Sequence, residues 1–359
     1  MIRPVVRSAT WLLFATLLSP SGAFAQPSGA SAAGDRIEGR AKFLPLPYVD
    51  YDRALGWGGG FIPVLMFNPV PDDTVSPSSM VGGFVMGTTN KTWAAMGFST
   101  LFLDEDKWRV TTAGGTGSVN FQFRLKGPID GWLPYNTAAD FGFAGVDRRV
   151  WGDLFVGASY IYAQFDTTVE GIPDSAGTTL HGIGLKSSMD RRENIRYPRQ
   201  GFVTEAEYRS FPSGLGNESP SNVVELDYNH YLSFRNDNDV LAARAYAGIG
   251  LGDLSFNQEF VVGGEDIRGY TQGEFRGKNL LAVQGEYRWN FHRRIGLVGF
   301  AGLATVLDAI NTEDDGKILP GGGIGFRFTA ETETHMNVGL DVAVGRGDWG
   351  VYFRFGEAF

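Results

Sequence analysis

A single arginine, Arg268, lies in the glycine-rich segment GGEDIRGYTQG, between apolar Ile267 and the pair Gly269 and Tyr270. A guanidinium keeps its charge in a protein, and its planar fork bonds a carboxylate through two parallel hydrogen bonds. The chemistry that these residues offer is therefore the pairing of a fixed positive charge with an acid from another element. The alternative is a solvated arginine in a surface turn.

The sequence offers little for catalysis. His181, in TTLHGIGLKSS, is the candidate base of a lipase-like or deacylase-like site, which needs a serine within reach on the same wall. Two residues further on stands Ile183, and Ser187 lies about 20 Å away along an extended strand at ~3.3 Å per residue. With no cysteine and only four histidines, a thiolate nucleophile or a Cys- or His-based metal site is not expected. We therefore predict no enzyme activity, no catalytic residue, no metal and no cofactor.

Residues 1–25 predict a secretory signal peptide. Arg3 and Arg7 precede a short apolar stretch, and Ala23–Ala25 fits an A-x-A cleavage site. The apolar stretch is shorter than the roughly 20 residues that a spanning helix needs. Residues 26–43 are small and polar and predict a linker, so the folded domain is expected over 44–359. With 40 Asp and Glu against 31 Lys and Arg, no nucleic-acid partner is expected.

Apolar and polar residues alternate with a period of two in several segments. In LLAVQGEYRWNF the odd positions from Leu281 to Phe291 are mostly apolar or aromatic, and the even positions include Gln284, Glu286 and Arg288. The segments VVELDYNHYL and FVTEAEYRSF repeat the pattern. Aromatic residues at strand ends suit a membrane interface, whereas a soluble sandwich seldom has them on its apolar face. The pattern indicates strands with one face toward lipid and one toward water.

About 15 such segments follow Leu55, separated by turns rich in Gly, Pro, Ser and Asn. Because bacterial single-chain barrels usually have an even number of strands, we predict 16, with the unrecognised strand near residues 127–152. The predicted fold is all-β: a 16-stranded antiparallel transmembrane β-barrel. Its expected location is the outer membrane of a Gram-negative bacterium, surrounded by outer-membrane lipid.

Four segments carry a family resemblance. GGEDIRGY resembles the [V/I]-R-G-[F/Y] signature of the BamA/TamA-type outer-membrane protein superfamily, whose members insert or translocate other proteins. VLDA, which contains Asp308, resembles the family's strand end, although Val and Ile310 replace a Phe and a Gly. YFRFGEAF, with Gly356 and Phe359, is similar to the family's final strand. DRRENIRYPRQG looks like the family's turn before a long strand, through Asp190, Arg192, Asn194, Pro198 and Gly201.

The resemblance implies that one long loop folds into the barrel lumen and is held there by Ile267–Tyr270. Arg268 would then pair with acids on the inner wall, and the expected acceptors are Glu286 and Asp308. The family also implies a weak seam between the first and last strands. Gly58–Gly60, expected in the first strand, and Gly356 would loosen it; alternatively these glycines only let strands bend in a closed barrel.

The family further implies a role in inserting or translocating client outer-membrane or secreted proteins. Typical members carry periplasmic polypeptide-transport-associated domains, and the stretch from residue 26 to Leu55 has no room for one. We therefore expect a barrel-only member, which would need a separate periplasmic partner chain to supply that half of the mechanism. Two alternatives stay open: a solute pore with a charged lumen, and a structural surface antigen without a transport role.

Overall fold

The structure is a computed structural model that describes residues 37, 40–52, 55–125, 131–171, 176–194, 197–235, 239–255, 258–264, 266–272, 274–331, 336–355 and 357–359. The predicted signal peptide, most of the predicted linker, and Gly356 lie outside these residues.

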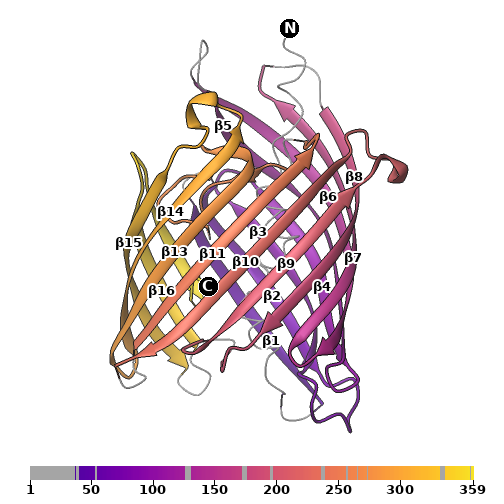
Figure 1. The fold of residues 1–359 in the computed structure, drawn as a ribbon, viewed down its shortest axis with the longest axis vertical. Coiled ribbons are helices and arrows are strands. Elements are labelled where there is room, and N and C mark those ends of the chain that lie inside the picture. The colour runs from indigo at the N-terminus through magenta and orange to yellow at the C-terminus, as the bar shows by residue number, and fades with distance from the viewer. Residues whose placement is uncertain are drawn as a thin grey trace.

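The described chain forms one antiparallel sheet that curves into a barrel (Figure 1). The strands are β1 (Ala41–Asp52), β2 (Gly56–Phe67), β3 (Ser79–Thr88), β4 (Trp93–Leu103), β5 (Trp108–Leu125), β6 (Gly131–Trp151), β7 (Leu154–Val169), β8 (Ala176–Asp190), β9 (Gly201–Phe211), β10 (Ser221–Phe234), β11 (Asp239–Gly252), β12 (Phe260–Val261), β13 (Arg276–His292), β14 (Ile295–Ala309), β15 (Leu319–Glu331), β16 (Met336–Val344) and β17 (Trp349–Phe355). Because β12 has only two residues, 16 long strands remain, which confirms the predicted fold class. The strand expected near 127–152 is β6.

The first strand differs from the expectation. β1 begins at Ala41, inside the predicted linker, and Gly58–Gly60 belong to β2, where they lie opposite Asp50, Val49 and Tyr48. Pro45 and Pro47 weaken the strand pattern of β1, because proline is depleted from central strands. An edge strand tolerates both, because a missing N–H costs no ladder bond on the open side.

The two faces of the sheet alternate as the sequence indicated. On β13, Val283 is 52% and Phe291 50% exposed, whereas Glu286 and Arg288 are each 1% exposed. The exposed apolar side chains form the outer face, and the buried ones form the inner face. No helix in the described parts of the chain is long and apolar enough to cross a membrane.

The inner face has two different halves. Strands β2–β8 contribute apolar side chains to one hydrophobic cluster, which includes Val64, Met66, Phe121, Phe141, Ile161, Phe165 and Leu180. Strands β9–β17 contribute buried charged and amide side chains, which include Glu207, Arg209, Glu225, Asp227, Arg244, Gln284, Glu286, Arg288, Arg327 and Asp341. The fully buried charged side chains of the described strands therefore gather on one half of the inner wall.

The two ends of the barrel also differ. One end, called here the long-loop end, holds the connections at residues 212–220, 253–275 and 310–318. The opposite end, called here the short-turn end, holds two-residue turns such as 152–153 and 293–294, together with the longer connections 68–78 and 191–200. Figure 1 shows these two ends at the top and bottom of the barrel.

Candidate functional site: an arginine network and the β1–β17 seam

Arg268 is fully buried against the inner face. Its Nε and Nη2 donate hydrogen bonds to Oε1 of Gln284 at 3.0 and 2.9 Å, its Nη1 donates to Asp341 at 2.6 Å, and its Nη2 also donates to Glu286. The guanidinium carbon lies 3.4 Å from the centre of the Phe300 ring. The arginine thus links β13, β14 and β16 through charge-assisted bonds and a cation–π contact.

The residues on either side of Arg268 also hold the segment between β12 and β13 against the inner face. Ile267 is 1% exposed and packs with Val262, Leu280, Val306 and Leu319. The hydroxyl of Tyr270 donates to the carbonyl oxygen of Pro320 at 2.6 Å. These contacts join the segment to the start of β15 and to its own hydrophobic cluster.

Gly269 explains why a glycine follows the arginine. Its φ is +108°, a conformation that side-chain-bearing residues rarely adopt. A Cβ there would lie 2.6 Å from the carbonyl carbon of Val344, and the Gly269 N–H donates to the Tyr352 hydroxyl at 2.9 Å. The glycine lets the segment approach β16 and β17 closely.

Three more arginines extend the network toward the short-turn end. Arg327 bonds Asp341 and donates to Glu357 at 3.0 Å, Arg354 donates to Asp341 at 2.9 Å, and Arg288 donates to Glu286 at 3.2 Å. Together with Arg268, four guanidinium groups share the carboxylates of Glu286, Asp341 and Glu357. A buried charge is tolerated only where such partners surround it.

Of the two carboxylates predicted to pair with Arg268, only one does so. Glu286 contacts Arg268, but Asp308 is exposed and accepts a hydrogen bond from the side-chain amide of Asn279 at 3.2 Å. Asp308 has φ +52°, so the alternation of β14 breaks there. Asp341, which the sequence reasoning missed, takes the second place. On β16, Leu340 and Val342 point outward and Asp341 between them points inward. This alternation of apolar and acidic residues in the sequence could have identified Asp341 as an inward-facing acid.

The predicted family turn forms a compact connection between β8 and β9. Arg192 bonds the carboxylate of Asp190 at 2.9 and 2.7 Å, and the N–H of Tyr197 donates to Asn194 at 3.0 Å. Gly201 has φ +100°, and a Cβ there would overlap the Arg191 carbonyl oxygen. The turn therefore requires a glycine at this position.

This turn reaches the arginine network. Arg288 Nη1 donates to the Pro198 carbonyl oxygen at 3.4 Å, and Arg288 Nη2 donates to the main-chain oxygen of Phe359 at 2.8 Å. Phe359 packs beside Tyr197, Tyr231 and Val240. The last residues of the chain therefore lie against the inner face at the short-turn end and do not continue β17.

The barrel closes between its first and last strands. β1 and β17 are neighbours, and each forms a continuous ladder with its other neighbour, β2 or β16. Between the described residues of β1 and β17 themselves, no ladder forms. This contact is called the seam below.

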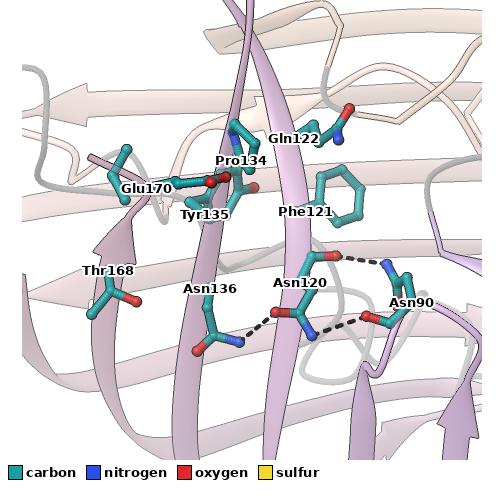
Figure 2. A pocket seen from close by; sticks show the side chains of 10 residues that line it. Asn90, Asn120, Phe121, Gln122, Pro134, Tyr135, Asn136, Thr168 and Glu170 are labelled. Carbon is teal, nitrogen blue, oxygen red and sulfur yellow. Dashed lines mark hydrogen bonds between the residues drawn. The ribbon is translucent and has the colours of Figure 1, made fainter. Parts of the chain in front are cut away.

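A cavity of about 380 Å³ lies elsewhere, at the long-loop end of β5–β7 (Figure 2). Asn90, Asn120 and Asn136 line it and are joined side by side by hydrogen bonds of 2.8–3.1 Å. Its ten lining residues include no Lys, Arg, His or Ser. Over the described part of the chain, no group of three or more His, Asp or Glu side chains is placed to hold a metal ion.

Glu259 is a partly buried acid that lies outside the network. Glu259, just before β12, has a side-chain oxygen that is buried without a hydrogen-bond partner among the described residues. Burial raises the pKa of Glu259 to about 7, while the nearby positive charges of Arg276 and Lys278 act in the opposite direction.

Solved structures share the fold. BamA from Haemophilus ducreyi lacking POTRA domains 1–3 is 11% identical with a TM-score of 0.64, covering 88% of this chain and 70% of that one. CdiB from Acinetobacter baumannii is 13% identical with a TM-score of 0.60, covering 88% and 59%. CdiB from Escherichia coli is 13% identical with a TM-score of 0.58, covering 90% and 68%. The chain thus spans between about three-fifths and seven-tenths of their lengths.

No curated protein is similar enough in sequence to count as a relative. The model of the Omp85 superfamily domain, in contrast, matches residues 82–355, which is most of the chain. This is a family of outer-membrane assembly and translocation barrels that are generally not enzymes. The 16 long strands agree with that match, and the chain belongs to the Omp85 superfamily.

Proposed function

We propose that this protein helps to insert or translocate other proteins at the outer membrane, by opening laterally between β1 and β17. The observation that carries the proposal is the seam. Every other pair of neighbouring long strands is joined by a backbone ladder, whereas the described residues of β1 and β17 are not. Unpaired edge groups favour the addition of another strand.

The segment at residues 262–275 would act as a latch inside the barrel. It bonds β13 and β16 through Arg268, and it reaches β17 through the N–H of Gly269. The segment thereby connects β16 and β17, the strands beside the seam, to β13. We infer that the long-loop end faces outward, because outer-membrane barrels have short periplasmic turns and longer extracellular loops.

The solute pore is the weaker alternative. Its charged wall would need ionised groups facing water, but Arg244 pairs with Asp227 at 2.7 Å and Lys186 with Glu205 at 2.6 Å. The opposite wall is the apolar cluster of β2–β8. Paired charges facing an apolar wall do not favour steady ion flow.

The test is folding of a client. An unrelated, urea-unfolded outer-membrane barrel is added to liposomes that hold the wild-type protein, the Arg268→Ala variant, or no protein. We expect wild-type vesicles to speed client folding and the variant to change that rate. Wild-type vesicles that fold the client no faster than empty ones, while conducting ions steadily, would establish the pore instead.

A further inference from the structure

We propose that the cavity at the long-loop end of β5–β7 binds a neutral saccharide (Figure 2). The proposal does not depend on client folding. It uses only the orientation inferred above, in which the long-loop end faces outward. It is argued from the bonding groups of the lining, its charge and its height on the barrel wall.

Three asparagine side chains of the lining are held in place by one another. Asn90 and Asn120 each donate from the side-chain amide to the other's main-chain oxygen, at 2.8 and 3.1 Å. Asn136 donates to Oδ1 of Asn120 at 2.9 Å and to Oγ of Ser118 at 2.8 Å. Figure 2 shows the three side chains in a row. Because these amides are already ordered, a ligand that bonds them immobilises few further side chains.

The lining keeps bonding groups for a ligand. Asn136 uses its amide nitrogen in the row, whereas its Oδ1 accepts no hydrogen bond from the described residues. Gln122 and Thr168 also line the cavity and are exposed. Amides and hydroxyls together offer both donors and acceptors. A sugar hydroxyl also donates and accepts, so this mixture suits a ligand that carries several hydroxyl groups.

The charge of the lining excludes an anion. Among the ten lining residues, Glu170 alone carries a charge, and it is negative. A phosphate or sulfate that entered the cavity would give up water without meeting a cation. A polar ligand without charge fits the lining better.

Two aromatic side chains supply the apolar part of the lining. Phe121 is 4% and Tyr135 6% exposed, and their ring centres lie 6.1 Å apart. A sugar ring has C–H groups on its faces and hydroxyls around its edge, so it contacts rings and amides together. The volume of about 380 Å³ lies within the range of about 300–1,000 Å³ that is usual for small-molecule sites. The cavity therefore suits a short saccharide.

The cavity lies at the level where the lipid ends. Aromatic side chains favour the membrane interface, and on the outer face Trp108 is 36% and Trp93 45% exposed. Trp93 lies opposite Ser118, just before Asn120. Between Trp108 and Ser118, β5 runs about 33 Å at ~3.3 Å per residue. At a tilt of ~40° this length spans an apolar band of about 25 Å. The cavity therefore begins where the band ends.

Two sources offer neutral sugars at this level. One is the sugar chain of a glycolipid in the outer leaflet, and the other is a free saccharide outside the cell. Both present the same hydroxyl and C–H groups to the lining. The probes of the experiment separate them.

NMR titration of the full chain in detergent micelles tests the proposal. The probes are the dephosphorylated core oligosaccharide of lipopolysaccharide, maltotriose and inorganic phosphate. Thr168→Trp fills the cavity, and Thr179→Trp makes the same change at an exposed threonine outside the lining. We expect a saccharide to bind the wild type and the control equally and to bind Thr168→Trp at least tenfold more weakly. Binding of the core oligosaccharide alone assigns the glycolipid as the source, and binding of maltotriose assigns a free saccharide.

Three results would overturn the proposal: no binding of either saccharide, equal affinity in Thr168→Trp and the control, or tighter binding of phosphate than of both saccharides. A second variant tests the amides without filling the cavity. Gln122→Ala with Asn136→Ala should weaken saccharide binding about tenfold, the factor that two ordinary hydrogen bonds supply. Heat-modified gel mobility shows that this variant stays folded, and an unchanged affinity in the folded variant would contradict recognition by the amides.

Discussion

Arg268 shares its acid partners with other arginines. Glu286 also contacts Arg288, and Asp341 also contacts Arg327 and Arg354. Removing Arg268 therefore leaves neither carboxylate unpaired, which is the costly outcome for a buried charge. Its loss should release the segment at residues 262–275 without unfolding the barrel.

We expect Arg268→Ala to weaken docking of this segment by about 2 kcal/mol, the usual contribution of a hydrogen bond to a charged group. Proteolytic cleavage within 262–275 measures the release, and heat-modified gel mobility shows that the barrel stays folded. Arg294→Ala, in an exposed turn, is the control. Equal cleavage in Arg268→Ala and the control would show that Arg268 does not hold the segment.

Glu259 should make the docking of the neighbouring residues depend on pH. Burial raises the pKa of its carboxyl to about 7. Below the ordinary carboxyl range the group is protonated whether docked or released. Between about pH 4.5 and 7 only the released form ionises. Docking should therefore weaken as the pH rises through this window.

Cleavage near residues 253–261 is expected to increase from pH 5 to pH 8 in the wild type. Glu259→Gln, which cannot ionise, should show a nearly constant rate. A parallel rise in both proteins, after correction for the protease's own pH profile, would rule out Glu259 as the cause.

At the scale of elements, the strands are the most predictable feature. The period of two in LLAVQGEYRWNF puts Glu286 and Arg288 on one face of a strand, and that face of β13 is buried. The first strand is harder to predict, because Pro45 and Pro47 depart from the strand pattern and only the position at a barrel edge makes them acceptable. Local sequence does not state which strand will be an edge.

The carboxyl-terminal residues belong to the same scale, because they connect elements that are distant in sequence. Phe359 packs with Tyr197, Tyr231 and Val240, and Glu357 bonds Arg327 and Asn337. They occupy the inner face at the short-turn end. The sequence indicates only that a terminal aromatic is present, not that it lies inside the barrel wall.

Phe359→Ala should raise ion conductance in planar bilayers, because it removes an aromatic ring from the short-turn end while leaving every long strand in place. A modest loss of stability, about 1–2 kcal/mol, is expected for a half-buried ring. Phe291→Ala, on the lipid-facing side of β13, should leave conductance unchanged. If both variants conduct like the wild type, the terminal residues do not narrow the barrel.

At the scale of the whole molecule, closure of the sheet decides which charges meet. Arg268 and Asp341 are 73 residues apart, and only the curvature of the barrel brings β16 to the segment before β13. Sequence reasoning reaches Glu286, which is on the next strand, and selects Asp308 where Asp341 is needed. Contacts set by closure depend on the stagger of all the strands, which no single strand pattern reveals.

The central claim is that the seam opens, and locking it is the most direct measurement. Cysteines at Val49 and Val351, joined by a flexible bis-maleimide, link β1 to β17; a control pair at Val49 and Gly59 links β1 to β2, where a ladder already exists. Client folding in liposomes is then compared with and without each link. We predict that the seam link removes the acceleration and that the control link leaves it intact. Equal acceleration with the seam locked would contradict lateral opening as the basis of function.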